Sequence, residues 1–267
     1  MSNIPLLTVG YSCLADRTED LRLPAACDGV EVIVAIQGGP VRTFSRRIRT
    51  FVVQGLGVAK SRNAVIDAAS GKYLLFCDDD VEVNLPGVLN GVRHLEASRQ
   101  AIVLGRSVDA AGQHRKSYPT RVSRLTRFNS AKAATYEMLI DVAQVRRAGV
   151  RFDERFGAGA ELYLADEYIF VTDLLAAGLT GEAIPEVFGI HPGTSSGERW
   201  GTDHDAHARA VALNRVFGRV APVARLLFAL RQGRRFGDWR RVLSFLTDNG
   251  QPPPLPWVDD PSQEDQR

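Results

Sequence analysis

Three consecutive aspartates, Asp78, Asp79 and Asp80, directly follow the apolar segment YLLFC. Side chains alternate along an extended chain, so Asp78 and Asp80 are expected to point to the same side. Two carboxylates about 4 Å apart repel each other by roughly 4 kcal/mol at an effective dielectric constant near 20. A divalent cation removes this repulsion, and carboxylate oxygens suit Mg²⁺ or Mn²⁺. The triplet therefore predicts a metal site; the alternative is a solvated turn in which one aspartate caps the next helix.

A segment with glycine and basic residues, GLGVAKSRN, precedes the triplet. It places Lys60, Arg62 and Asn63 at the start of an expected helix, where the helix dipole and free N–H groups favour an anion. Gly55 and Gly57 follow a strand, as in a dinucleotide fingerprint, but Lys60 occupies the position of the third glycine. The pattern therefore favours an anion such as a diphosphate over NAD or FAD.

The elements that position these residues can be read from apolar patterning and turn residues. Strands are predicted at Ile4–Tyr11, Val30–Ile36, Thr50–Val53, Tyr73–Cys77, Ala101–Val108, Ala133–Ile140 and Glu186–His191. Helices are predicted within 54–71 and at Leu85–Ser98, Gln144–Ala148 and Leu162–Ala177, with a polar, basic loop over the active face at 109–130.

This order of elements predicts an α/β fold. Strands alternate with helices in the first half, which implies a Rossmann-like, mostly parallel sheet with helices on both faces. Ligands of open α/β sheets bind beyond the carboxyl ends of the strands, where the aspartates lie.

The length, net charge and cysteine content argue against several classes of protein. The chain has 267 residues, a net charge of +2 and three cysteines without a C-x-x-C pair. This composition argues against a disulfide framework, a cysteine-based zinc site and a nucleic-acid partner. The N-terminus lacks the pattern of a signal peptide, and no apolar stretch approaches the roughly 20 residues that span a bilayer. A cytoplasmic location is expected.

Two long motifs resemble those of family 2 glycosyltransferases, which have the GT-A fold. GLGVAKSRNAVIDAASGKYLLFCDDDVEV resembles their nucleotide-sugar signature, and FDERFGAGAELYLADEYIFVTDLLAAGL resembles their acceptor-side signature. FGIHP resembles the short strand and histidine that often follow. Together the motifs span about residues 4–195 in the family's order. The resemblance implies a metal-dependent enzyme that transfers sugar from a nucleotide-sugar to a hydroxyl of a glycan or glycolipid precursor, as in polysaccharide biosynthesis.

The resemblance also implies roles for the residues of the first motif. It makes Asp80 the direct ligand of Mn²⁺ or Mg²⁺, with His191 completing the metal site. Asp78 would contact the nucleotide or the water shell of the metal, and Arg62 would lie near the aspartates and the diphosphate. The family often has acidic residues and a serine after the second strand. This chain has AIQGG there, so Gln37 is the candidate for a hydrogen bond to the base.

The acidic pair Asp166 and Glu167 supplies the candidate general base. The family usually reads Gly-Glu-Asp where this chain has Ala165, Asp166 and Glu167. The usual base position falls on Glu167, and Asp166 is the alternative. A single carboxylate base with direct attack implies inversion at the anomeric carbon. Without the motif, the pair would be read as acids that complement a helix dipole.

The last part of the chain is basic and interleaved with apolar residues. Residues 205–250 predict a basic helical extension, 251–267 a disordered Pro-rich tail, and 1–204 the GT-A-like domain, with a nucleotide-sugar half at 1–108 and an acceptor half at 109–204. The segment 209–241 suits either peripheral contact with the inner face of a membrane or packing on the catalytic domain, with nucleic acid as a weaker third interpretation.

Parts of the sequence also suit three other functions. A sugar-phosphate nucleotidyltransferase is disfavoured because YSCLADRTED, after the first strand, is poor in glycine. A catalytically silent module that binds nucleotide-sugar or glycan stays open because the acidic pair is altered. GTSSG at 193–197 matches G-x-S-x-G but lacks the strand–turn–helix context of a serine hydrolase, and a lid over the donor is the preferred interpretation.

Overall fold

The computed structural model describes residues 4–40, 44, 48–191 and 199–253. The strands are β1 (Leu7–Leu14), β2 (Val30–Gln37), β3 (Ile48–Val53), β4 (Tyr73–Asp78), β5 (Glu82–Val83), β6 (Ile102–Val108), β7 (Ser123–Arg124), β8 (Met138–Asp141) and β9 (Gly181–Ile190). The α-helices are α1 (Val58–Ala68), α2 (Leu85–Ser98), α3 (Val142–Ala148), α4 (Asp166–Ala176), α5 (Asp203–Phe217), α6 (Ala221–Gln232) and α7 (Trp239–Thr247). The segment GTSSG and most of the Pro-rich tail lie outside the described residues.

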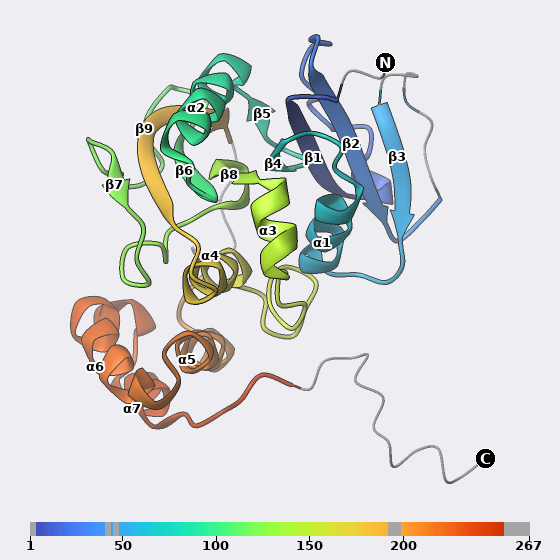
Figure 1. Cartoon of the computed structure of the whole chain (residues 1–267). Helices are drawn as coiled ribbons and strands as arrows, with labels where there is room; N and C mark the ends of the chain where they lie inside the picture. Colours follow the sequence, from blue (N-terminus) through green and yellow to red (C-terminus); the bar gives the residue numbers. More distant parts are fainter. Residues whose placement is uncertain (1–3, 41–43, 45–47, 192–198, 254–267) are drawn as a thin grey trace, which may run out of the picture.

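The strands form one sheet in the order β3-β2-β1-β4-β8-β6-β9-β5, with β7 paired to β9 (Figure 1). β3, β2, β1 and β4 are parallel, and so are β6 and β9. The short strand β8 is antiparallel to both of its neighbours, β4 and β6. The predicted α/β class with a mostly parallel sheet is confirmed.

Helices cover both faces of the sheet and enclose two apolar cores. One core lies between the sheet and α1, α3 and α4, and contains Val65, Val145 and Phe170. The other lies between the sheet and α2, and contains Val88 and Val92. Burial of both faces explains why β1, β2 and β4 read as continuous apolar runs.

Four predicted elements differ from the observed ones by three residues or more. The first strand runs over Leu7–Leu14 because pairing with β2 and β4 extends past Tyr11. The strand predicted at Ala133–Ile140 begins with a 3₁₀ helix at Thr135–Glu137 and becomes extended only at β8. α4 starts at Asp166, four residues later than predicted, and β9 starts at Gly181, five residues earlier. In each case tertiary contacts outweigh the local pattern.

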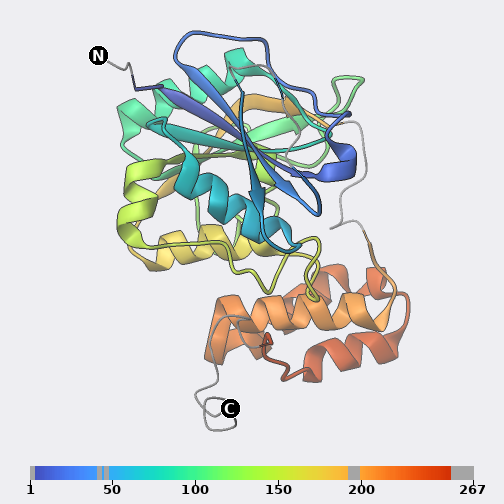
Figure 2. The same cartoon turned by 90° about the vertical axis from the view of Figure 1, so that its right-hand side faces the viewer.

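The C-terminal helices α5, α6 and α7 form a layer beside α4, on the side away from the sheet (Figures 1 and 2). α5 packs on α4 through Val211 and Ala212, which share a core with Ile169. A second core, around Phe236 and Phe245, joins the three helices to Tyr168. The helical extension is therefore packed on the α/β fold through α4. No helix among the described residues is long and apolar enough to cross a membrane.

Candidate active site

The guanidinium of Arg62 joins the two motifs at the carboxyl end of β4. Its Nη2 donates to Asp78 Oδ1 at 3.1 Å, and its Nη1 lies 3.4 Å from Glu167 Oε1 and also donates to Asp166 Oδ2. Arg62 lies on α1, Asp78 ends β4, and the acidic pair begins α4. Segments about 100 residues apart in the sequence therefore meet at one buried cation.

The charges in this cluster determine one another's protonation. Burial alone would lower the pKa of Arg62, but Asp166, Glu167 and Asp78 outweigh it and raise the pKa above its ordinary value. Burial raises the pKa of Asp78, and Arg62 opposes this shift. The guanidinium thus stays charged, and it offsets the repulsion among three carboxylates.

The pKa values of the two members of the acidic pair shift in opposite directions. Burial and the charge of Glu167 raise the pKa of Asp166 well above its usual value, although Arg62 lowers it. The pKa of Glu167 is lowered, because Arg62 and a hydrogen bond from Thr135 outweigh its burial. Thr135 Oγ1 donates to Glu167 Oε1 at 2.7 Å. The Asp166 side chain is 4% exposed and that of Glu167 is 21% exposed, so the ionised acid is the accessible one.

Asp80 and His191 lie together at the other side of the aspartate triplet. His191 Nε2 is 3.4 Å from Asp80 Oδ1, and the His191 ring stacks on Tyr136 with centroids 5.1 Å apart. The hydrogen bond with Asp80 raises the pKa of His191, and the same bond lowers the pKa of Asp80. A carboxylate and an imidazole that converge in this way can share a cation.

The donor set fits a cation that takes few ligands from the protein. The described residues contain no group of three or more His, Cys, Asp or Glu side chains placed to hold a metal. Asp80 and His191 supply one oxygen and one nitrogen, and Mg²⁺-type sites complete their shell with substrate phosphates and water. Asp78 faces Arg62 instead. The predicted ligands Asp80 and His191 thus lie together, whereas the predicted ligand Asp78 pairs with an arginine.

Arg17 contacts the aspartate triplet, and the sequence analysis did not predict this contact. It lies in the 3₁₀ helix after β1, and its Nη2 is 3.0 Å from Asp79 Oδ1 and 4.0 Å from Asp80 Oδ2. Asp79 is buried, and burial together with the neighbouring aspartates raises its pKa to about 6 despite Arg17. Arg17 therefore fixes the middle of the triplet. The segment YSCLADRTED does not predict the ion pair between Arg17 and Asp79, because that pair forms only when β1 and β4 lie side by side in the sheet.

The loop after β3 and the loop before α4 pack closely against each other. Val58 N donates to Ala158 O at 2.9 Å. Gly157 and Gly159 have positive φ, and a Cβ on Gly157 would lie 2.7 Å from the carboxyl carbon of Asp166. A Cβ on Gly159 would lie 3.1 Å from Gly57. Glycine is needed here because the acceptor-side motif approaches the donor-side motif without room for side chains.

Gln37 and Asn63, which were predicted to contact the substrate, form hydrogen bonds to main-chain atoms of this protein instead. Gln37 donates from Nε2 to Gly57 O at 2.7 Å and accepts from Gly57 N at 3.2 Å. Asn63 donates to Phe152 O and to Glu154 Oε1, both at 3.0 Å, and accepts from Phe152 N at 2.8 Å. Both side chains are buried. A substrate contact through the Asn63 amide would have to replace one of these bonds. Lys60 is partly exposed beside Gly55.

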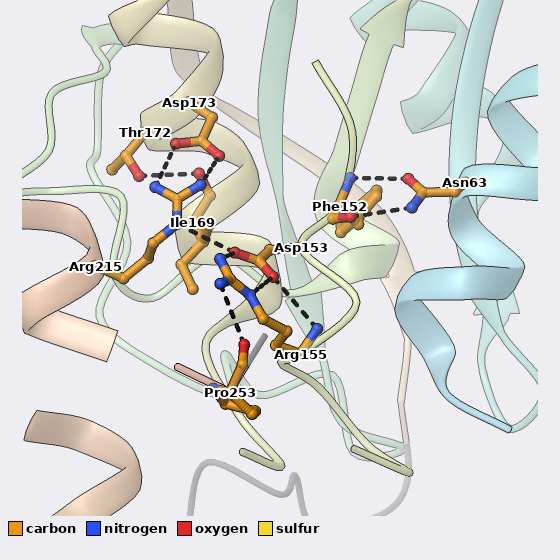
Figure 3. Close-up of polar contacts among 9 residues, drawn as sticks. All are labelled: Asn63, Phe152, Asp153, Arg155, Ile169, Thr172, Asp173, Arg215 and Pro253. Carbon is orange, nitrogen blue, oxygen red and sulfur yellow. Dashed lines mark hydrogen bonds and ion pairs between the residues drawn. The ribbon is translucent and has the colours of Figure 1, made fainter. Parts of the chain in front are cut away.

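Figure 3 shows the side of the loop that faces the C-terminal helices. Asp153 accepts from Arg155 at 2.6 Å and from Arg215 at 3.1 Å, while Arg215 also pairs with Asp173 at 2.7 Å. A surface hollow of about 480 Å³ lies among these residues and Asn63. The arginines and acids named here are paired with one another, whereas the candidate site lies at Arg62 and the aspartates.

Comparison with known proteins gives one family match and several structural neighbours. Residues 32–153 match the sequence model of the family described as glycosyl transferase family 2. No curated protein matches the chain. Among solved structures, the chain is similar to TarS from S. aureus, with a TM-score of 0.56 and 13% identity over 82% of this chain and 39% of that chain.

Two complexes of TarS residues 1–349 show the same likeness. The complex with UDP gives a TM-score of 0.55 and 15% identity over 88% of this chain and 72% of that chain. The complex with UDP-GlcNAc gives 0.52 and 13% over 90% and 81%. The chain thus spans about two fifths of the longer TarS chain and most of the shorter one. Residues 32–153, a little under half of the chain, thus match glycosyl transferase family 2, and the fold of the chain is similar to that of TarS.

Proposed function

We propose that this protein transfers a sugar from a nucleotide-sugar to a hydroxyl of a glycan or lipid-linked glycan precursor, with inversion at the anomeric carbon. The observation that supports this most directly is the joining of Asp78 and Glu167 by Arg62. It brings the residues of the donor-side motif and the candidate base of the acceptor-side motif into one cluster. The TarS complexes with UDP and UDP-GlcNAc support a nucleotide-sugar as the donor.

In this proposal the ionised Glu167 accepts the proton of the acceptor hydroxyl. The acceptor oxygen then forms a bond to the anomeric carbon while the bond from that carbon to the diphosphate oxygen breaks. Thr135 orients the Glu167 carboxylate. Arg62 offsets part of the negative charge of the three acids, which lowers the repulsion that an approaching diphosphate meets. Residues 1–108 provide the donor side of the cluster and 109–204 the acceptor side.

Asp80 and His191 would hold Mn²⁺ or Mg²⁺, whose chemistry is to neutralise charge on the departing diphosphate. Lys60, partly exposed beside the loop before α1, is suited to the same phosphate charge. Gln37 stays a candidate for the base only through the remaining N–H of its amide, since Gly57 occupies the rest. A cytoplasmic location and peripheral membrane contact through 209–241 belong to the same proposal.

The proposal is tested by thermal shift of the purified protein with a panel of nucleotide-sugars, UDP-GlcNAc first, in Mn²⁺, Mg²⁺ or chelator. We expect one donor to raise the melting temperature only when the metal is present, and Asp80→Asn to remove this effect. The matched control is Asp16→Asn, which removes an exposed carboxylate of the same type nearby. The donor site is refuted if every nucleotide-sugar leaves the melting temperature unchanged in both metals.

The nucleotidyltransferase and the silent binding module can be distinguished from the transferase with the same purified protein. A nucleotidyltransferase would release diphosphate from a nucleoside triphosphate and a sugar phosphate. A silent binding module would show the metal-dependent shift but would neither transfer nor hydrolyse the sugar of any donor that binds. The ionised, accessible Glu167 favours the transferase over the silent module.

A further inference from the structure

The helix α6 turns an apolar face to the solvent. Four of its large side chains recur at helical spacing on one face, and each is about half exposed or more. They are Val223 at 60%, Leu226 at 49%, Leu227 at 59% and Leu230 at 77%. In a helix of a protein in water this face is ordinarily the one that packs on the core.

The opposite face of α6 buries an arginine. Arg225 is 2% exposed, and its Nε and Nη1 atoms have no hydrogen-bond partner among the described residues. It lies on the same side of the helix as Ala221, which is also buried. The inward side of the helix packs Phe228 and Ala229 on the core and also holds a buried cation, while the leucines point outward. An apolar environment outside the helix would account for the outward leucines.

Exposed apolar residues are concentrated in this part of the chain. Of the fourteen large hydrophobic residues exposed among the described ones, seven lie between Val220 and Leu243. On α7, Trp239 is 69% exposed and Leu243 52% exposed, one helical turn apart. We call the exposed side chains of residues 220–230, together with Phe128, the apolar face. A patch of this kind on a protein surface marks an interaction site.

The charge around the apolar face has one sign. Residues 206–237 contain seven arginines and no aspartate or glutamate. The exposed arginines of this segment are Arg219, Arg231, Arg234 and Arg235. Residues 110–136 form a second stretch without acids, with four arginines and two lysines.

These two stretches meet in space. The ring of Phe128 lies 5.6 Å from that of Phe217, at the end of α5, and the guanidinium of Arg127 lies 6.0 Å from the Phe217 ring. Phe128 is 77% exposed. The loop that follows β7 thus extends the apolar face beyond α6 and brings Arg127 to its edge.

We propose that the apolar face binds an anionic phospholipid surface, with leucines of α6 and Phe128 entering the interface and the surrounding arginines contacting headgroups. Exposed leucines flanked by arginines match a surface whose interior is apolar and whose outside is negative. A second copy of this chain is disfavoured as the occupant, because two faces with this charge repel each other. The proposal rests on the membrane contact of 209–241 in the proposed function, and it deepens that contact by naming the lipid charge and the residues that enter the interface.

The test is sedimentation of the full chain with vesicles of neutral phosphatidylcholine or of phosphatidylcholine with 30% phosphatidylglycerol. We expect binding to the anionic vesicles only, weakened at high salt. Arg234→Gln with Arg235→Gln should weaken it roughly thirtyfold, at the usual contribution of a basic residue near such a surface. Leu227→Ser with Leu230→Ser should weaken it at least about tenfold, since two half-exposed leucines lose their apolar partner.

Matched controls separate this surface from non-specific adhesion. Ile4→Ser changes an apolar residue that is also 77% exposed, and Arg93→Gln removes an exposed arginine of α2. Both variants should bind vesicles as the unaltered chain does. The proposal is overturned if anionic vesicles do not bind, if the leucine pair has no effect, or if nucleic acid binds more tightly than vesicles. A dimer that the leucine pair abolishes would also overturn it.

Vesicle binding needs neither donor nor sugar transfer, so it can fail or succeed independently of the proposed activity. Circular dichroism and melting of each variant show whether it is folded, and exposed positions of this kind tolerate serine without loss of stability.

Discussion

At the scale of single residues, the site depends on how one guanidinium is shared. Arg62 contacts Asp78, Asp166 and Glu167, and its own side chain is 5% exposed. Three carboxylates this close would otherwise repel, so the cluster needs the buried cation to exist in the folded state. The same cation keeps Glu167 ionised, which a general base requires before the reaction begins.

The acidic pair gives a prediction that separates its two members. Glu167→Gln removes the ionised, accessible carboxylate, and we expect kcat to fall about 10²- to 10⁴-fold with little change in the donor's KM. Asp166→Asn replaces a carboxyl whose raised pKa already favours the neutral form, so we expect less than about a tenfold loss. Steady-state kinetics of both variants decide the matter. A larger loss in Asp166→Asn would transfer the base assignment to Asp166.

At the scale of elements, the start of α4 determines where the acidic pair points. The residue before it, Ala165, has φ of +76° in the left-handed region, which favours glycine. Glycine is also the residue that the family motif has at this position. The turn brings Asp166 against Gly157 and leaves Glu167 facing Thr135. An alanine held in this conformation stores strain next to the site.

Replacement of this alanine should therefore stabilise the protein. Ala165→Gly relieves the left-handed strain, and we expect the free energy of unfolding to rise by roughly 0.5–1 kcal/mol after the entropy of the unfolded glycine is subtracted. Chemical denaturation measures the change. The control is Ala177→Gly at the end of the same helix, where φ is −74° and glycine should destabilise by roughly 0.5–1 kcal/mol. Equal effects of the two changes would contradict this account.

At the scale of the whole molecule, the helical extension is tied to the catalytic fold by a charge network as well as by apolar packing. Asp153 of the acceptor-side loop pairs with Arg215 of α5, and Arg215 reaches Asp173 of α4 (Figure 3). Burial would raise the pKa of Asp153, but the hydrogen bonds from Arg155 and Arg215 outweigh it and lower the pKa below its usual value.

This shift predicts how stability depends on pH. Because the folded-state pKa of Asp153 is lowered, its contribution is complete above the unfolded pKa near 3.9 and is lost as the pH falls through the folded value. We expect Asp153→Asn to reduce the free energy of unfolding by about 1.5–3 kcal/mol at pH 7, and the difference from the unaltered chain to shrink below about pH 4. Denaturation series at pH 7, 5, 4 and 3 measure it.

The matched control is Asp67→Asn. Asp67 also pairs with an arginine, Arg151, but its side chain is 58% exposed. An exposed pair is screened by solvent and contributes about 0–1 kcal/mol. A loss at Asp67 as large as that at Asp153 would show that burial of the network is not the source of its effect.

The fold was largely predictable from the sequence because its strands are buried on both faces. Tyr73–Cys77 and Val30–Ile36 are continuous apolar runs, and such runs between helical segments specify a parallel sheet. The errors lie where packing overrides the local pattern. Thr135–Glu137 reads as strand but forms a 3₁₀ helix, because Thr135 bonds to Glu167 and Tyr136 stacks on His191.

The sequence by itself determined which residues gather at the site. Asp78, Asp80, Arg62 and Glu167 follow from two motifs, and His191 from the short segment FGIHP after them, in an order and spacing that resemble those of one family. Their gathering at one edge of the sheet follows from the parallel topology, because the carboxyl ends of parallel strands meet there.

Only the tertiary structure decided which side chains pair. Asp78 pairs with Arg62, Asp79 with Arg17 and Asp80 with His191. The Asn63 side chain forms hydrogen bonds with the backbone of Phe152. The tertiary structure also turned the leucines of α6 outward. Periodicity places residues on a face of a helix but does not say what that face meets, since burial is settled by contacts between segments that are distant in the sequence.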